Sequence, residues 1–136
     1  MKSKNFFLAL LTALILSSSV SCDRSPDGIC DLDEVIGFAF KDIDVPAAGD
    51  SVQVHINSSE WWLSFLIYND QELSLDTVRH RPPLEIDHPN FRIHVPDQHN
   101  IHVYMSENTG DTPRRLEIHL QDGDCMAKIT LKQAAP

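Results

Sequence analysis

Strict alternation of apolar and polar residues limits how this chain can fold more than any other feature. Successive side chains of a β-strand point to opposite faces, so an alternating segment predicts a strand with one buried side and one side in water. The two-residue period runs through residues 52–56, 91–95, 101–105 and 116–120. Turn-forming residues separate these segments at 48–50, 57–59, 69–70, 108–111 and 122–123. Short strands punctuated by turns, with no convincing helical stretch, predict an all-β antiparallel sandwich.

The hairpin around residues 122–123 can be given a register from the sequence. Asp122-Gly123 is a signal for a type I′ turn, and as a two-residue loop it pairs Leu120 with Cys125. Glu117 then faces Lys128, an opposite-charge pair across the two strands. This register puts the apolar residues of both strands on one face and predicts that Cys125 points inward.

A second hairpin is predicted to close over residues 96–100 and to place His94 beside His102 on an outer face. Neighbouring imidazoles on a hairpin can hold zinc or copper. Solvent-facing strand positions also accept histidine without any ligand, and no cysteine or carboxylate lies at ligand spacing beside this pair. We therefore predict no metal site.

The segment 60–68 (EWWLSFLIY) is the most apolar stretch after residue 22. Read as a strand, it puts Trp61 in the core and leaves Trp62 and Tyr68 together on the opposite side. An exposed pair of aromatic rings offers a flat apolar platform with polar edges, on which a pyranose ring can stack. The alternative is a strand covered on both faces, which a nearly continuous apolar run also indicates.

The stretch 71–90 is harder to assign. Leu73, Leu75 and Val78 are compatible with one more strand. Three prolines between residues 82 and 89 remove backbone donors, so residues 80–90 are predicted to form a stiff loop.

The first 22 residues have the organisation of a lipoprotein export signal. Lys2 and Lys4 form a positive n-region, and residues 6–16 form an uncharged apolar run. Such a run is too short for a membrane span, which needs about 20 residues, but it suits a signal peptide. Ser19-Val20-Ser21-Cys22 resembles a lipobox, which implies cleavage before Cys22 and a lipid on its thiol. The alternative is an ordinary secreted protein in which Cys22 merely lies near the cleavage site.

Three segments follow from this boundary: a signal peptide over 1–21, a lipidated tether over 22–33 and one sandwich domain over 34–136. The whole chain has a net charge of −9, and the signal holds two lysines and no acidic residue, so the remainder carries −11. That acidity excludes nucleic acid as a partner, because its phosphates would be repelled.

Cys30 and Cys125 are the cysteines that follow Cys22. In an oxidising periplasm or at a cell surface such a pair is readily bridged. Closing so long a loop contributes about 4–5 kcal/mol in the chain-entropy model. The alternative is two unpaired thiols, with Cys125 packed in the core.

Three short motifs follow the pattern of one known family. They are GDSVQV at 49–54 with Asn57 and a tryptophan at 61 or 62, Asn108-Thr109-Gly110 with an arginine at 114 or 115 before strand 116–120, and ITLKQ at 129–133. Together they resemble the BACON domain (Bacteroidetes-associated carbohydrate-binding, often N-terminal) over roughly residues 35–135. The resemblance implies an immunoglobulin-like sandwich on the envelope of a bacterium that handles glycans. It assigns no particular sugar-contacting residue.

No catalytic motif is present: the sequence lacks G-x-S-x-G, H-E-x-x-H and a P-loop. A sandwich of this size rarely builds a cleft deep enough to desolvate the pair of carboxylates that a glycosidase needs. We predict a non-enzymatic module without a cofactor, held by the lipid on Cys22 to the periplasmic or surface face of the outer membrane. Its predicted role is to bind a glycan or to act as a spacer. The alternative is an accessory subunit that binds an envelope protein through the apolar face of Trp62, Leu66 and Tyr68.

Overall fold

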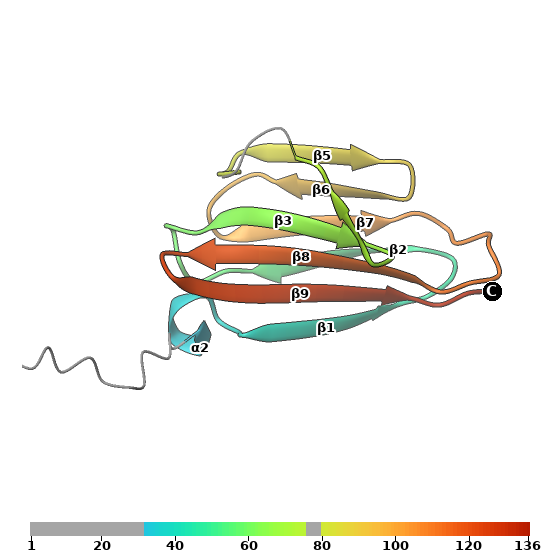
Figure 1. Ribbon diagram of the computed structural model, residues 1–136, viewed down its shortest axis with the longest axis horizontal. Helices are drawn as coiled ribbons and strands as arrows, with labels where there is room; N and C mark the ends of the chain where they lie inside the picture. The colour runs from blue at the N-terminus through green and yellow to red at the C-terminus, as the bar shows by residue number, and fades with distance from the viewer. Residues whose placement is uncertain (1–31, 76–79) are drawn as a thin grey trace, which may run out of the picture.

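The computed structural model describes residues 32–75 and 80–136, which form two β-sheets packed face to face (Figure 1). A single turn of helix, α2 (Leu32–Val35), comes first in the described range. The strands are β1 (Phe40–Val45), β2 (Asp50–His55), β3 (Trp62–Tyr68), β4 (Gln71–Leu73), β5 (Leu84–His88), β6 (Phe91–Val95), β7 (Asn100–Met105), β8 (Arg114–Asp122) and β9 (Cys125–Gln133).

Strand pairing gives an immunoglobulin-like β-sandwich, as the sequence predicts. One sheet has five strands in the order β1-β9-β8-β3-β4, and the other has four in the order β2-β7-β6-β5. Successive strands such as β2 and β3 lie in different sheets, which is the Greek-key connection of this architecture. β1 pairs with β9 in parallel, whereas the other described pairs are antiparallel. The described residues form nine strands, where the sequence predicts about seven.

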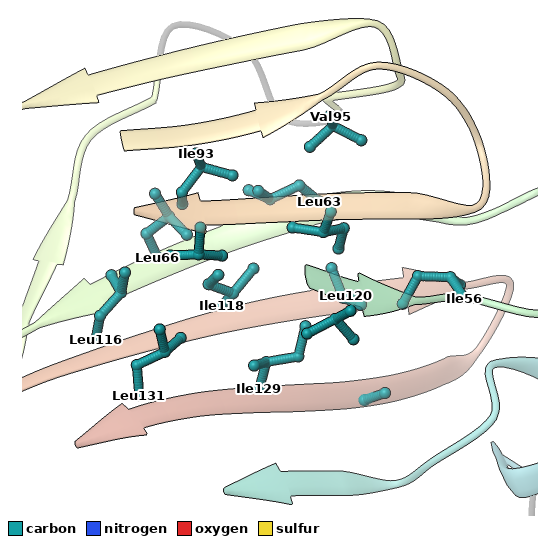
Figure 2. Close-up of a cluster of buried hydrophobic side chains, with 14 of the residues drawn as sticks. Ile56, Leu63, Leu66, Ile93, Val95, Leu116, Ile118, Leu120, Ile129 and Leu131 are labelled. Carbon is teal, nitrogen blue, oxygen red and sulfur yellow. The ribbon is translucent and has the colours of Figure 1, made fainter. Parts of the chain in front are cut away.

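The core lies between the sheets and is built from the inward-facing members of the alternating segments (Figure 2). Val54, Ile93, Ile101 and Ile118, one from each segment, are no more than 1% exposed. Full burial of one such side chain contributes roughly 1.5–3 kcal/mol, so the alternation that predicts the strands also supplies most of the driving force.

The turn of the β8-β9 hairpin lies one residue later than predicted, and the pairing register shifts by two residues. Asp122 pairs with Cys125, and Gly123 has a positive φ of 57° in the turn. Leu120 therefore faces Ala127 and not Cys125, and Glu117 faces Thr130 and not Lys128. Because side chains alternate with a period of two, a shift of two residues leaves every side chain on its predicted face. The predicted pairing of His94 with His102 in the β6-β7 hairpin is confirmed.

Strand β3 contains a bulge that the sequence pattern does not reveal. Leu63 pairs with Leu120 and Phe65 with His119, so Ser64 is an extra residue opposite the continuous strand β8. An extra residue reverses the alternation beyond it. Phe65 consequently turns to the outer face, and Leu66 turns into the core with no exposed surface.

The prediction of a stiff loop over 80–90 is wrong in part. Residues 84–88 form β5, which pairs with β6 at the edge of the four-stranded sheet. The prolines at 82, 83 and 89 lie outside the strand, and an edge strand uses only one side of its backbone for pairing. Of the strand suggested around Leu73, Leu75 and Val78, β4 ends at Leu73, and Val78 lies outside the described residues.

Candidate ligand-binding face

Trp62 does not form the exposed platform that the sequence predicts. Trp61 is fully buried, and its indole Nε1 donates a hydrogen bond of 2.6 Å to the backbone oxygen of Gln98. Trp62 points to the other side of β3, but it is only 7% exposed. The guanidinium of Arg81 lies over its ring, 5.8 Å from the centroid. The 80–83 segment is held beside β3 by two backbone hydrogen bonds between Leu63 and His80 and covers this face.

Tyr68 lies on the inner side of the sandwich because of the bulge at Ser64. Its ring is 4.9 Å from that of His88 and 5.4 Å from that of Phe91. His88 stacks on Phe91 at 4.5 Å, and its partial burial lowers the pKa of its imidazole. Trp62 and Tyr68 therefore do not share a surface, and the predicted apolar docking face with Leu66 is not formed.

The outer face of the four-stranded sheet instead gathers polar side chains and one aromatic ring. Strand register aligns these side chains in two rows that cross all four strands. The first row is Ser51, Tyr104, Arg92 and Asp87, and the second is Gln53, His102, His94 and Glu85. All eight alternate with core residues of the same strands, and all eight are exposed.

Tyr104 is the aromatic residue of this face and is 51% exposed. A shallow hollow of about 300 Å³ lies beside it. Its walls include Ser51, Gln53, Arg92, His94, His102 and Tyr104. Among the described residues, neither the hydroxyl of Tyr104 nor the carboxylate of Glu85 takes part in a side-chain hydrogen bond or ion pair. These groups are therefore available to a ligand.

Other groups on the face are held in place by their neighbours. Arg92 Nε donates a hydrogen bond of 2.6 Å to Asp87, and this bond raises the pKa of the guanidinium. The rings of His94 and His102 lie 6.0 Å apart, tilted by 46°. The side chains of Arg92 and Asp87 are 61% and 67% exposed. Their polar atoms that are not used in the ion pair are therefore accessible to solvent.

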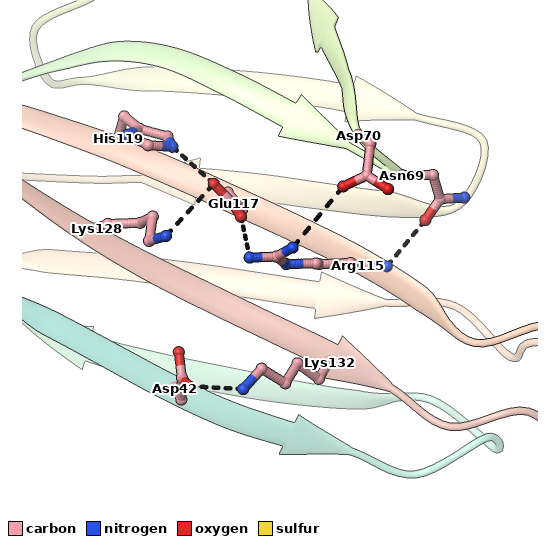
Figure 3. Close-up of polar contacts among 8 residues, drawn as sticks. All are labelled: Asp42, Asn69, Asp70, Arg115, Glu117, His119, Lys128 and Lys132. Carbon is pink, nitrogen blue, oxygen red and sulfur yellow. Dashed lines mark hydrogen bonds and ion pairs between the residues drawn. The ribbon is translucent and has the colours of Figure 1, made fainter.

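The outer face of the five-stranded sheet differs because charged groups on β1, β8 and β9 are paired with one another (Figure 3). Glu117 is 8% exposed and contacts the cationic side chains of Arg115 and Lys128 and the imidazole of His119. Burial raises the pKa of Glu117, but the hydrogen bond with His119 and the nearby positive charges outweigh it, and the pKa is lowered. Self-paired charges of this kind stabilise a sheet surface and offer little to a ligand.

Asn108 and Gln133, which belong to the short motifs noted in the sequence, are buried side chains that stabilise the fold. Asn108 is 2% exposed, and its Nδ2 donates hydrogen bonds to the backbone oxygens of Thr112 at 2.9 Å and Ala134 at 3.0 Å. Gln133 is 1% exposed, and its Nε2 donates to the backbone oxygen of Ser106 at 2.7 Å. Both side chains tie the 106–112 turn to the end of β9 and cannot reach a ligand.

The remaining predicted sites lie mostly outside the described residues. Cys22 and Cys30 are both in the undescribed range, so lipidation of Cys22 stays a prediction. Cys125 is disulfide-bonded and partly buried. The bridge from Cys30 to Cys125 stays a prediction, because Cys30 lies outside the described residues. Within residues 32–75 and 80–136, no helix has the length and apolarity to cross a membrane. The same residues contain no group of three or more potential metal ligands.

Comparisons with known proteins support the fold and carry no functional assignment. No protein-family model matches the chain, and no curated protein matches it. A structure determined by NMR for a protein from Bacteroides thetaiotaomicron is similar with a TM-score of 0.60 and 17% identity, over 70% of this chain and 76% of that one. Tandem immunoglobulin domains A164-A165 of titin align with a TM-score of 0.41 and 10% identity, over 73% of this chain and 44% of that one. At 17% identity the likeness to the Bacteroides thetaiotaomicron protein concerns the fold alone, and the weaker titin alignment carries no argument.

Sequence reasoning missed Tyr104 as a candidate, although its signal is in the alternation. The period of segment 101–105 puts His102 and Tyr104 on the outer side. Tyr104 attracts no notice because it is a single aromatic residue in an ordinary strand, whereas the Trp61-Trp62 doublet is conspicuous. Trp62 and Tyr104 differ in their exposed fraction, which depends on the residues that cover each ring.

Proposed function

We propose that this protein is a non-catalytic lipoprotein module of the cell envelope that binds a glycan on the outer face of its four-stranded sheet. The observation that carries the proposal is the exposed ring of Tyr104 beside a hollow lined by hydrogen-bonding side chains. A pyranose presents a flat C–H face and a rim of hydroxyls. The ring of Tyr104 can stack on the C–H face. The hydroxyls can form hydrogen bonds with polar side chains of the hollow, which are those of Arg92, His94, His102 and Gln53.

Two sequence features support the location and the ligand class. Residues 1–22 have the pattern of a lipoprotein signal ending at Cys22, which implies attachment to a membrane through lipid. The motifs at 49–54, 108–110 and 129–133 resemble BACON domains, which implies work on glycans. Asn108 and Gln133 of these motifs are structural, so the resemblance bears on the module and not on its contacts.

Affinity electrophoresis in gels that contain soluble xylan, mannan, laminarin or pectin tests the proposal. The domain, including its disulfide, should be retarded by at least one of these polysaccharides. Tyr104→Ala should abolish the retardation, because the stacking ring is lost. Phe40→Ala is the matched control, since Phe40 is an aromatic residue that is 75% exposed on β1 of the other sheet; it should leave retardation unchanged.

Two results would contradict glycan binding at this face. If wild-type protein passes every gel unretarded, glycan binding is contradicted and the spacer role is the one that stands. Retardation that survives Tyr104→Ala but is lost in Phe40→Ala would move the binding face to the five-stranded sheet. Circular dichroism of each variant confirms that the sandwich is folded, so a loss of binding is not a loss of fold.

A further inference from the structure

The hollow beside Tyr104 continues across the sheet. A second hollow, of about 230 Å³, is lined by Pro83, Leu84, Glu85 and His94. His94 also lines the first hollow, so the two meet at this side chain. Together they run from β2 and β7 over β6 to β5, across the strands and not along them.

The length of this track exceeds what one sugar ring can contact. Tyr104 is on β7 and Glu85 is on β5, two strand spacings apart, which is about 10 Å. A ring stacked flat on Tyr104 leaves the second hollow to another ring of the same chain. The carboxylate of Glu85, which makes no side-chain hydrogen bond or ion pair among the described residues, is then placed to accept hydrogen bonds from the hydroxyls of that ring.

The charges on the track favour a ligand without acid groups. Arg92 and Glu85 line the track, and Asp87 lies beside Arg92 on the same face, so one positive charge is accompanied by two negative ones. Arg92 is engaged with Asp87 at 2.6 Å, which offsets its attraction for an anion. The chain as a whole carries −9. A uronate or sulfated polymer would bring further negative charge to Glu85 and would be repelled.

We infer that the ligand is a neutral oligosaccharide that lies across β7, β6 and β5, with one ring on Tyr104 and a second ring at Glu85. This inference rests on the proposed glycan binding and deepens it by naming the length and charge of the ligand. Glu85 is a specificity residue in this arrangement, because it selects for a second hydroxyl-bearing ring and against an acidic one.

Isothermal titration with xylose, xylohexaose, mannose, mannohexaose and hexagalacturonate tests the inference on the wild-type domain. The neutral hexasaccharide of the preferred series should bind at least about tenfold more tightly than its monosaccharide, as a second set of contacts requires. Hexagalacturonate should bind more weakly than the neutral hexasaccharide. Glu85→Gln should weaken the hexasaccharide about tenfold and leave the monosaccharide unchanged. Glu72→Gln, at an exposed glutamate of β4 in the other sheet, should change neither.

The outcomes separate this inference from the proposed function. Equal affinities for monosaccharide and hexasaccharide, both lost in Tyr104→Ala, would uphold glycan binding and overturn the two-ring track. Tighter binding of hexagalacturonate than of the neutral hexasaccharides would overturn the charge argument in the same way. Absence of binding to every titrated sugar, together with no retardation in any of the polysaccharide gels, would overturn both.

Discussion

Glu117 Oε2 lies 2.9 Å from His119 Nε2, on the same outer face of β8, because two residues of one strand that are two apart share a face. His119 in turn stacks on Phe65 at 4.1 Å, the residue that the β3 bulge turns outward. Arg115 and Lys128 complete the surroundings of the carboxylate. The bulge and the ion cluster thus stabilise each other at the centre of the five-stranded sheet.

Glu117→Gln should lower the free energy of unfolding at pH 7 by about 1.5 kcal/mol, because the charged acceptor is lost. The pKa of Glu117 is lowered from its ordinary value of 4.5 in the folded protein. Its contribution is therefore complete above about pH 4.5 and is lost as the pH falls through the folded pKa. Urea unfolding at pH 7 and at pH 3 measures this, and the two proteins should converge at the lower pH.

Asp42→Asn is the matched control for this experiment. Asp42 also pairs with a lysine, Lys132, but both side chains are at least half exposed. Exposed ion pairs contribute little, so the change at pH 7 should be smaller than for Glu117→Gln. An equal or larger effect of Asp42→Asn would show that burial does not determine the strength of the Glu117 cluster.

Asn108→Ala should destabilise the domain by roughly 3 kcal/mol. The substitution removes the hydrogen bonds to the oxygens of Thr112 and Ala134 and the one accepted from the Gly110 amide at 3.2 Å. Each buried group left without a partner costs about 1–3 kcal/mol. Thermal unfolding followed by circular dichroism measures the loss. Normal retention of folded Asn108→Ala on glycan gels is also expected, and impaired retention would assign this asparagine to binding.

Gly49→Ala should cost more stability than Gly123→Ala. Both glycines have positive φ, 85° and 57°, which adds roughly 1–2 kcal/mol of strain for any other residue. A Cβ at Gly49 would also lie 2.4 Å from the backbone oxygen of Met105, whereas a Cβ at Gly123 has no atom within 4 Å. Chemical denaturation of the two variants compares them directly. Equal losses would mean that the turn before β2 moves away from Met105 at little cost.

Trp62 should be shielded from a quencher in the native protein. Acrylamide quenching of the Trp61→Phe variant reports on Trp62 alone, since the chain has two tryptophans. At 7% exposure its indole should quench far less than the same indole in urea. Arg81→Ala removes the guanidinium over the ring and should increase quenching. Native quenching as strong as in the unfolded chain would restore Trp62 as a candidate for ligand contact.

The sequence by itself determines which side of each alternating strand faces the core. In segments 91–95 and 101–105 the period of two is a local property of the backbone, so the buried and exposed members can be read directly. Even the two-residue error in the β8-β9 register left Leu120 and Ile118 inside, because the error equals the period. The outward direction of the Tyr104 side chain is likewise determined by this alternation.

Tertiary structure alone decided which outward residues stay exposed and where the alternation breaks. Trp62 and Tyr104 both point away from the core, but the segment with Arg81 covers the first and nothing in the described residues covers the second to the same degree. The bulge at Ser64, the parallel pairing of β1 with β9 and the addition of β5 at an edge depend on residues distant along the chain. Exposure and pairing are properties of neighbours in space, and a linear pattern does not contain them.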